Sequence, residues 1–417
     1  MPSEIRVRRI DPTDAATMLD MDQLVWSDPQ QVPREEALRD VPTRAGFIAA
    51  IDGEDVGIAG SWDVEVSVPA TGGGASLRPA EGLTWVGVHP DFRRRGVLTA
   101  LMRHHLRWVR EEQGRAISIL KASEASIYGR FGYGAATHEL MKTFPAGARF
   151  EAPAQVEELA AATSTRTSRC APEQAERVLA LARRCGGLAA GHVLRSAEDL
   201  ARILRDVPQT RVGSEPAHLL WATRHGEDVG CAWFRRHPTW SRGAPDGRLD
   251  VSWVLDLDAG ARLALGRRLT SFDLMSETVY WTATDDPLLL WQSTQRPHGS
   301  GICDDLWLRV TDLPRAVADR GHAADLDLNL RVSDEHLPEN AGTWHWSATE
   351  GSGSLRPTEG PAELTLDIAD LGALCLGDQS VGARVRAGHV LEHRPGAAAE
   401  LDAALRTPTR PVASVDF

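Results

Sequence analysis

Apolar and polar residues near the start of the chain follow two different periods. Over residues 12–25 the apolar positions recur at helical spacing, which predicts a helix. Residues 47–51 and 56–68 have the composition of strands, and Asp52-Gly53 between them is typical of a tight hairpin turn. The chain is therefore expected to begin with a helix that leads into an antiparallel hairpin.

The next segment predicts a loop, a strand and a long helix. Residues 70–82 are rich in glycine and alanine and are expected to form a flexible loop. An apolar strand follows at residues 83–88 and ends at Pro90. After Gly96 the apolar side chains recur with the period of an amphipathic helix, which is expected to end near Gly114.

A further strand and a short helix complete this first region. Residues 116–120 alternate as a strand does, and residues 123–131 have a helical pattern that Gly132 and Gly134 end. The order is helix, antiparallel strands, helix, strand and helix. This order predicts a mixed α/β domain.

An internal repeat indicates that the first region has a second copy. Gly-Glu-Asp-Val-Gly occurs at residues 53–57 and again at 226–230, each time between two strand candidates. Trp-Val opens an apolar strand both at 85–86 and at 253–254. We infer a duplication. The second copy lacks the Arg-Arg-Arg-Gly found at 93–96, so we expect it to be degenerate and without a cofactor.

The last third of the chain has a different pattern. Apolar and polar residues alternate over 326–332 and 364–368, which is typical of half-buried antiparallel strands. Helix candidates at 313–320 and 397–405 flank these strands. We therefore expect an α+β domain at this end.

Length and composition fit a multidomain globular protein. The 417 residues exceed what one hydrophobic core usually serves, and we divide them into domains at residues 1–150, 151–300 and 301–417. Apolar residues make up 42%, yet no run approaches the roughly 18 consecutive apolar residues of a membrane span. The N-terminus has charges where a secretory signal needs apolar residues, so the expected location is the cytoplasm.

Charge and cysteine content exclude some partners and favour others. The formal net charge of -12 argues against general nucleic-acid binding and favours attraction of cationic partners. The five cysteines are widely spaced, with no Cys-x-x-Cys pair and no histidine at ligand spacing. We therefore expect buried reduced thiols and no metal.

The strongest chemical signal is a basic turn between a strand and a helix. The apolar strand Val86–Val88 leads through three consecutive arginines, Arg93–Arg95, to Gly96 and the helix start. Unpaired backbone N–H groups at a helix N-terminus bind phosphate, and the helix dipole favours the negative charge. Glycine allows close approach, and the arginines add affinity. The pattern therefore predicts a diphosphate site.

This strand, turn and helix start resemble the acyl-CoA signature of the GNAT superfamily of N-acetyltransferases. The resemblance implies that the diphosphate of acetyl-CoA binds at the turn and that the pantetheine runs beside the strand. Leu98 departs from the family, which usually has a small residue at this position. The implied CoA contacts are Val86, Gly87, Val88, Arg93, Arg94, Arg95, Gly96, Val97, Leu98 and Thr99.

A second motif narrows the resemblance. Residues 123–134, Ser-Glu-Ala-Ser-Ile-Tyr-Gly-Arg-Phe-Gly-Tyr-Gly, together with the final Asp-Phe, are similar to the enhanced intracellular survival (Eis) family of acetyltransferases. The likeness implies two tandem GNAT-like domains, the second degenerate, and a sterol-carrier-protein-like C-terminal domain. It also implies that Tyr128 is the general acid, that the terminal carboxylate of Phe417 is the general base, and that Ser123 and Glu124 contact CoA. Related proteins form hexamers.

These two catalytic roles differ in what they demand. A phenol with a pKa of about 10 can protonate a departing thiolate without much tuning. A terminal carboxylate with a pKa of about 3.5 must be buried to accept a proton from an amine, or it must act through water on a less basic amine. Tyr133, between two glycines, is expected to be a core aromatic residue. His104 and His105 are expected on a solvent-exposed helix face without a role.

The sequence therefore predicts an N-acetyltransferase that uses acetyl-CoA and transfers the acetyl group directly to an amine of a cationic small molecule. Strand amides near Val86–Val88 are expected to stabilise the oxyanion of the tetrahedral intermediate. Two alternatives stay open. One is acetylation of lysine in proteins or peptides, and the other is a non-catalytic protein that binds acyl-CoA or lipid through its C-terminal domain.

Overall fold

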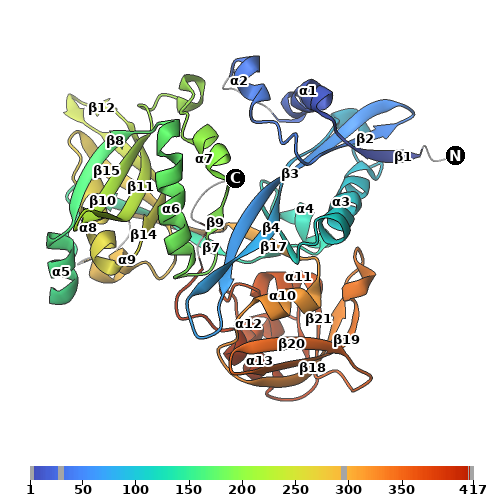
Figure 1. Cartoon of the computed structure of the whole chain (residues 1–417). Coiled ribbons are helices and arrows are strands. Elements are labelled where there is room, and N and C mark those ends of the chain that lie inside the picture. Colours follow the sequence, from blue (N-terminus) through green and yellow to red (C-terminus); the bar gives the residue numbers. More distant parts are fainter. Residues whose placement is uncertain (1–3, 27–31, 293–297, 412, 414–417) are drawn as a thin grey trace. The chain divides into compact units, whose positions relative to one another are not determined.

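The computed structural model describes residues 4–26, 32–292, 298–411 and Ala413. These residues form two compact units. Of the described residues, one unit combines the chain up to Ala136 with Leu306–Thr407, and the other combines Thr137–Asp305 with residues 408–411 and 413 (Figure 1). Among the described residues, no helix is both long enough and apolar enough to cross a membrane.

The first unit contains a mixed sheet with strand order β1-β2-β3-β4-β5-β17-β6, in which only β4 and β5 pair in parallel. Its strands are β1 (Ile5–Arg9), β2 (Gly46–Ile51), β3 (Glu54–Pro69), β4 (Ala75–Val88), β5 (Ile117–Lys121), β17 (Leu306–Val310) and β6 (Gly134–Ala135). Its helices are α1 (Ala15–Val25), α2 (Arg34–Leu38), α3 (Val97–Arg107) and α4 (Ala125–Tyr128), and a π-helical turn at Trp108–Glu112 extends α3.

The prediction of a loop over residues 70–82 is wrong for most of this segment. The turn takes only residues 70–74, where three glycines have positive φ, and β4 begins at Ala75. Residues 75–88 pair with β3 from the Pro69–Ala75 pair onward. Pairing with a long neighbouring strand overrides the weak strand preference of alanine, glycine and proline.

The second unit has a sheet with strand order β16-β7-β15-β14-β11-β10-β8. Its strands are β7 (His138–Pro145), β8 (Ser164–Arg169), β10 (His218–Arg224), β11 (Glu227–His237), β14 (Gly247–Asp256), β15 (Met275–Thr282) and β16 (His298–Asp304), with the short β9 (Val193–Leu194), β12 (Trp240–Ser241) and β13 (Ala244–Pro245). Its helices are α5 (Ala154–Ala161), α6 (Ala175–Gly186), α7 (Ala197–Ile203), α8 (Ala259–Leu269) and α9 (Pro287–Trp291).

The repeated pentapeptide occupies the same place in both sheets. Asp52 and Gly53 have φ of 51° and 88°, and His225 and Gly226 have φ of 53° and 83°. Each pair forms the turn of an antiparallel hairpin, and the register shifts by one residue shortly before each turn. This agreement supports the inferred duplication.

Two strands depart from the order expected of consecutive domains. β7 follows the first region in sequence but pairs with β15 and β16 in the second sheet. β17, which follows the second region in sequence, pairs with β5 and β6 in the first sheet. The division into domains at residues 150 and 300 stays a prediction. β7 lies before residue 150 but pairs in the second sheet, and β17 lies after residue 300 but pairs in the first sheet.

The C-terminal part of the first unit is a second, five-stranded sheet with order β20-β19-β18-β21-β22 and helices packed on it. Its strands are β18 (Leu326–Ser333), β19 (Gly342–Thr349), β20 (Ser352–Pro357), β21 (Leu364–Asp367) and β22 (Leu391–Glu392). Its helices are α10 (Leu313–Asp319), α11 (Ile368–Leu374), α12 (Val381–Arg386) and α13 (Ala397–Leu405). The α+β expectation is confirmed for this part.

The expected exposure of His105 is wrong. His105 has no exposed surface and lies on the buried stripe of α3, one turn after Leu101. Its ring packs edge-on against Phe47, and neither ring nitrogen has a hydrogen-bond partner in the described part of the chain. Burial lowers the pKa of His105 to about 3, so the ring is neutral.

We expect His105 to make the protein less stable in mild acid. The unfolded chain binds a proton at a pKa of about 6.5 while the folded ring stays neutral, so stability falls as the pH drops below about 6.5. Between pH 7.5 and 5.5 this one residue accounts for about 1.4 kcal/mol. Denaturant unfolding of the wild type and of His105→Leu at both pH values measures it. Equal losses in the two proteins would contradict the prediction.

Candidate active site

The first component of the site is the free N-terminus of α3. Gly96 precedes the helix in the left-handed conformation, with φ of 89°. The backbone N–H groups of Val97, Leu98 and Thr99 have no acceptor among the described residues, while the next amide, that of Ala100, bonds to the Gly96 carbonyl. These donors and the positive end of the helix dipole favour an anion at this point.

Three arginines surround this helix start. Arg93, Arg94 and Arg95 are exposed and have no ion pair with any described residue. Arg95 stacks over the ring of Phe92, with 4.9 Å between its guanidinium carbon and the ring centroid. Arg94 has a left-handed backbone with φ of 61°. The turn thus presents three uncompensated cations beside free amide donors, and this arrangement favours a polyvalent anion.

The strand that leads into this turn has one free edge. β4 and β5 pair in parallel only at Glu81 with Ser118 and at Gly82 with Ile119, after which the two strands diverge. The other edge of β4 stays paired with β3 up to Val88. The backbone groups of Val86–Val88 on the β5 side are therefore available to an extended ligand that adds to the strand.

Two glycines allow neighbouring elements to approach this strand. A Cβ on Gly57 of β3 would come within 2.8 Å of Val97 Cγ1, so α3 packs tightly under the strands. A Cβ on Gly87 would meet Val25 at 3.3 Å, which places the end of α1 against β4. The next residue, Trp26, follows the end of α1 and is 42% exposed.

Tyr128 and Tyr133 lie together where β4 and β5 separate. Their rings meet edge to face with 6.2 Å between centroids. The Tyr133 hydroxyl is buried 2.9 Å from Ser118 Oγ, and Ser118 Oγ donates to the Glu81 carbonyl. Glu81 and Ser118 form one of the two residue pairs between β4 and β5. The bond from Tyr133 to Ser118 therefore attaches the tyrosines to the point where these strands separate.

The two tyrosines differ in what their hydroxyls can do. Tyr128 is half-buried and its hydroxyl has no hydrogen-bond partner among the described residues, whereas Tyr133 is fully buried and bonded. Burial, with a smaller effect of the Glu124 charge, raises the pKa of Tyr128. The phenol of Tyr128 is therefore protonated at neutral pH and free to donate a proton. The expectation that Tyr133 is a core residue is confirmed.

The C-terminal part of the unit holds the tyrosine segment in place. A Cβ on Gly132, which has φ of 81°, would come within 2.8 Å of the Arg309 guanidinium. A Cβ on Gly134 would come within 2.5 Å of the backbone nitrogen of Ala373 in α11. His336 Nε2 lies 2.9 Å from the Arg130 carbonyl and donates to it in one tautomer. The glycines in this motif are therefore points of close packing.

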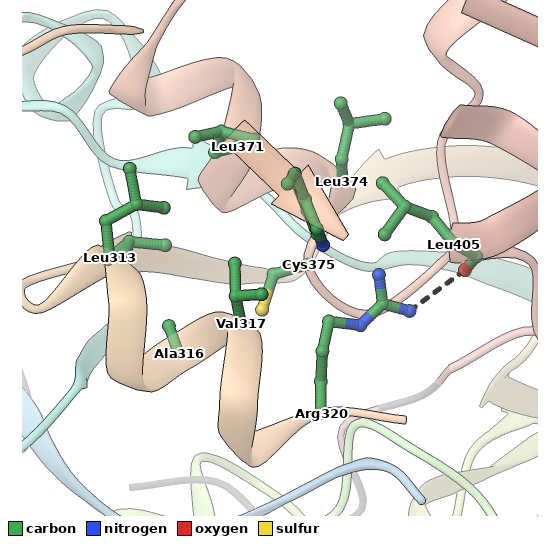
Figure 2. Close-up of a pocket in the computed structure, with 10 residues that line it drawn as sticks. Leu313, Ala316, Val317, Arg320, Leu371, Leu374, Cys375 and Leu405 are labelled. Atoms are coloured by element: carbon green, nitrogen blue, oxygen red, sulfur yellow. Dashed lines mark hydrogen bonds between the residues drawn. The ribbon is translucent and has the colours of Figure 1, made fainter. Parts of the chain in front are cut away.

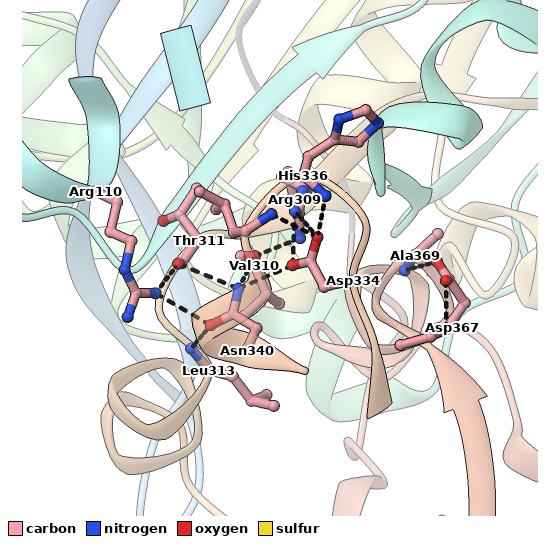
Figure 3. A network of polar contacts seen from close by, with 12 residues as sticks. Arg110, Arg309, Val310, Thr311, Leu313, Asp334, His336, Asn340, Asp367 and Ala369 are labelled. Atoms are coloured by element: carbon pink, nitrogen blue, oxygen red, sulfur yellow. Dashed lines mark hydrogen bonds and ion pairs between the residues drawn. The ribbon is translucent and has the colours of Figure 1, made fainter. Parts of the chain in front are cut away.

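Arg309 belongs to a buried polar network beneath this segment (Figure 3). Its guanidinium is fully buried and bonds to both oxygens of Asp334 at 2.7 Å. Asp334 also accepts from the backbone N–H groups of His336 and Leu337 and from the side-chain amide of Asn340. The Asp334 carboxylate thus joins β17 to residues 336–340.

Sequence reasoning missed Glu81, which is fully buried at the point where β4 and β5 separate. Burial raises its pKa, while the Arg44 guanidinium at 3.0 Å and the Ser61 hydroxyl at 2.8 Å act against this rise. These partners tie β4 to β3 and to the loop before β2. The sequence contained no signal, because a single glutamate in a segment predicted as loop has no reason to be buried.

The corresponding helix start in the second unit is closed to anions. Asp258 caps α8, since its carboxylate accepts from the Ala261 N–H at 3.0 Å, and Arg224 pairs with the same carboxylate. A Cβ on Gly260 would clash with Leu159 of α5, which covers this end of α8. A negative side chain thus occupies the N-terminus of α8, whereas the N-terminus of α3 is free, as expected for a degenerate copy.

The remaining predicted residues lie in different places. Ser123 and Glu124 are exposed immediately before α4, and Val86 and Val88 are half-buried on β4. Phe417, predicted to supply the base, lies outside the described residues. No group of three or more histidine, cysteine, aspartate or glutamate side chains in the described ranges is arranged to hold a metal ion.

Comparison with known proteins agrees with this architecture. Residues 6–136 match the family model of an acetyltransferase (GNAT) domain, and residues 313–414 match that of a sterol carrier protein domain. The chain is similar to an uncharacterized N-acetyltransferase of Streptomyces coelicolor, with 36% identity over 83% of this chain and 82% of the relative. It is 32% identical to the N-acetyltransferase Eis of Mycobacterium tuberculosis over 81% of this chain and 80% of the relative.

Among solved structures, the chain resembles Eis1 of Mycobacterium abscessus. The TM-score is 0.81 at 26% identity, and the match covers 99% of this chain and 100% of the other. This full-length match and the two domain matches confirm the predicted fold class, with tandem GNAT-like domains and a sterol-carrier-like C-terminal domain.

Proposed function

Since the chain belongs to the Eis family of GNAT N-acetyltransferases, we propose that it moves the acetyl group of acetyl-CoA to an amine of a cationic small molecule. Acceptors of this class include polyamines and aminoglycoside-like compounds. One observation carries the proposal: the free N-terminus of α3 lies among three unpaired arginines, directly after a strand with an open edge.

The residues on the strand, turn and helix match the parts of acetyl-CoA in order. Arg93–Arg95 and the amides from Gly96 to Thr99 bind the diphosphate. The open edge of Val86–Val88 pairs with the pantetheine, as an added strand does. Ser123 and Glu124, at the start of α4, complete the groove opposite β4. The side chain of Leu98 departs from the usual small residue, but the backbone donors beside it are free.

Acetyl transfer needs a proton donor for the leaving thiolate. The amine nitrogen attacks the thioester carbonyl, the new C–N bond forms, and the C–S bond breaks. Tyr128 gives its phenolic proton to the departing sulfur, and the backbone amides of Val86–Val88 stabilise the oxyanion. A base takes the proton from the amine. The assignment of this base to the carboxylate of Phe417 stays a prediction, as do the hexamer and the cytoplasmic location.

Charge and aromatic surface favour a cationic acceptor. The formal net charge is -12, which attracts cations to the protein at low ionic strength. Trp26, directly after α1, is 42% exposed, and indole faces attract ammonium groups. A second tryptophan, Trp62, is half-buried on β3 and is proposed to extend this surface.

We expect Arg93→Ala and Arg94→Ala each to raise the KM for acetyl-CoA by about tenfold while kcat stays near the wild-type value. The reason is that each substitution removes one charge-assisted phosphate contact, worth about 1.5–3 kcal/mol before solvent screening. Steady-state thiol release measures both constants, and the difference should shrink in high salt. Arg107→Ala is the matched control, because Arg107 is exposed near the other end of α3.

The same assay separates the possible functions when spermidine, an aminoglycoside and a lysine peptide are compared as acceptors. Faster thiol release with the two small polycations supports the proposal, and faster release with the peptide favours protein acetylation. If acetyl-CoA binds and no amine releases thiol, the chain is a binding protein and the proposal is wrong.

A further inference from the structure

The C-terminal domain contains a small cavity next to a buried arginine (Figure 2). Its volume is about 20 Å³. A space of roughly 10–15 Å³ is enough for one water molecule, so this cavity has room for a water or a monatomic ion and none for an organic chain. The residues that line it are all buried: Val310, Leu313, Ala316, Val317, Arg320, Trp346, Leu371, Leu374, Cys375 and Leu405.

The cavity lining includes one charged residue, Arg320. It is 4% exposed, and its Nη2 donates to the Leu405 carbonyl at 3.0 Å (Figure 2). Its Nε and Nη1 are buried and have no hydrogen-bond partner in the described part of the chain. Burial lowers the pKa of Arg320 to about 10, so the guanidinium is charged at neutral pH. Two donors and one positive charge are thus left without a partner among the described residues.

Arg320 differs in this respect from comparable residues. The three other buried arginines among the described residues each lie beside a carboxylate: Arg195 with Asp199, Arg262 with Asp286, and Arg309 with Asp334. An isolated buried charge is strongly unfavourable unless a partner compensates it. The contrast indicates that the negative partner of Arg320 comes from outside the chain.

Two ionisable groups interact electrostatically with Arg320, and neither is negative at neutral pH. Burial raises the pKa of the Cys375 thiol, so Cys375 is neutral. Burial also lowers the pKa of His322 to about 4, so this ring is neutral as well. Asp319, next in sequence, lies 3.6 Å from Arg78 Nε instead. The missing charge is therefore not supplied by these neighbours.

We propose that this cavity binds a single chloride ion. The ion accepts hydrogen bonds from Nε and Nη1 of Arg320, and the neutral thiol of Cys375 on the same cavity wall is a further, weaker donor. Val317 and Leu374 help to enclose it. A water molecule fits the same space and satisfies the two nitrogens, but it leaves the positive charge uncompensated. Phosphate, sulfate and carboxylates with a hydrocarbon tail exceed the volume.

Chloride in this cavity should stabilise the folded protein by mass action, because the unfolded chain lacks the site. A chloride concentration ten times Kd favours the folded state about 11-fold. For a unit of this size, that factor corresponds to a rise in Tm of roughly 3–6 °C. The effect concerns stability and not acetyl transfer, so it is independent of the proposed function.

Thermal unfolding of the full-length protein tests this expectation in sodium chloride, sodium bromide and sodium gluconate at equal concentrations. The three salts have the same ionic strength, and gluconate is too large for the cavity. We expect chloride and bromide to raise Tm by roughly 3–6 °C relative to gluconate, with an effect that saturates. A crystal grown in bromide should show the anomalous signal of one ion within hydrogen-bonding distance of Arg320 Nε and Nη1.

Two variants separate the site from a general salt effect. Arg320→Met keeps the length of the side chain without its charge, and the Tm difference between chloride and gluconate should disappear. Arg386→Met is the matched control, because Arg386 is exposed on α12 of the same domain, and it should keep the wild-type difference. Circular dichroism checks folding. If Arg320→Met does not fold, the position of bromide in the wild-type crystal decides the result.

Three outcomes would overturn the proposal. One is an equal Tm of the wild type in chloride and in gluconate. The second is an equal effect of chloride on the wild type and on Arg320→Met, which would show a general action of the salt. The third is density for a water molecule beside Arg320 without the anomalous signal of bromide.

Discussion

Tyr128→Phe is expected to lower kcat for acetyl transfer by about 10²–10⁴-fold, the usual contribution of a general acid, with little change in the KM for acetyl-CoA. The phenol hydroxyl of Tyr128 is free and protonated at neutral pH, and its half-buried ring packs against Tyr133. Removing one oxygen leaves the ring packing against Tyr133 intact. Steady-state thiol release with saturating amine measures the effect.

Tyr133→Phe is the matched control for this substitution. It removes the same atom from the neighbouring ring, at the cost of the bond to Ser118, worth about 1 kcal/mol of stability. Its kcat should stay within a few-fold of the wild type. If Tyr133→Phe lowers kcat as much as Tyr128→Phe, or if Tyr128→Phe has no effect, Tyr128 is not the proton donor.

Asp334→Ala is expected to destabilise the first unit by about 3–5 kcal/mol, because it leaves Arg309 charged and fully buried without its partner. For a unit of this size each kcal/mol lowers Tm by roughly 2–4 °C, so the fall should be about 6–20 °C. Calorimetry of the full chain measures it. The Arg309 guanidinium also packs directly against Gly132, in the segment that contains Tyr128. If Arg309 moves, this segment loses its packing, and kcat should fall.

Asp367→Ala is a suitable comparison in the same domain. Asp367 caps α11, accepting from the Ala369 N–H at 3.0 Å, and its loss should cost about 1 kcal/mol (Figure 3). If Asp334→Ala is no more destabilising than this cap variant, the Arg309–Asp334 pair does not hold the tyrosine segment. A fall in Tm without a fall in kcat would limit its role to stability.

The relation between the C-terminal domain and the reaction follows from these contacts. α11 and His336 press against the segment from Arg130 to Gly134, directly after Tyr128. The domain that matches a sterol carrier therefore packs, within the same compact unit, against the segment that follows the proposed proton donor Tyr128. This packing accounts for the glycines at 132 and 134, where any side chain would displace Arg309 or α11.

Local signals in the sequence were sufficient for several features. The hairpin turn at Asp52-Gly53 requires a left-handed backbone, and the Asp-Gly pair favours this conformation. The helix start after Gly96 was equally readable, because free amides and a helix dipole arise from a few consecutive residues. The degenerate second copy was recognisable from its missing arginines, although the capping role of Asp258 was not.

Features that depend on distant partners needed the folded chain. The strand over residues 75–82 exists because β3 pairs with it, and His105 is buried because its helix face meets Phe47. Nothing near Glu81 or Arg320 in the sequence indicates that their charges are buried. The placement of β7 and β17 in exchanged sheets is likewise set by which edges are unpaired after folding. Backbone conformation is a property of neighbouring residues, whereas burial and strand pairing depend on other elements of the folded chain.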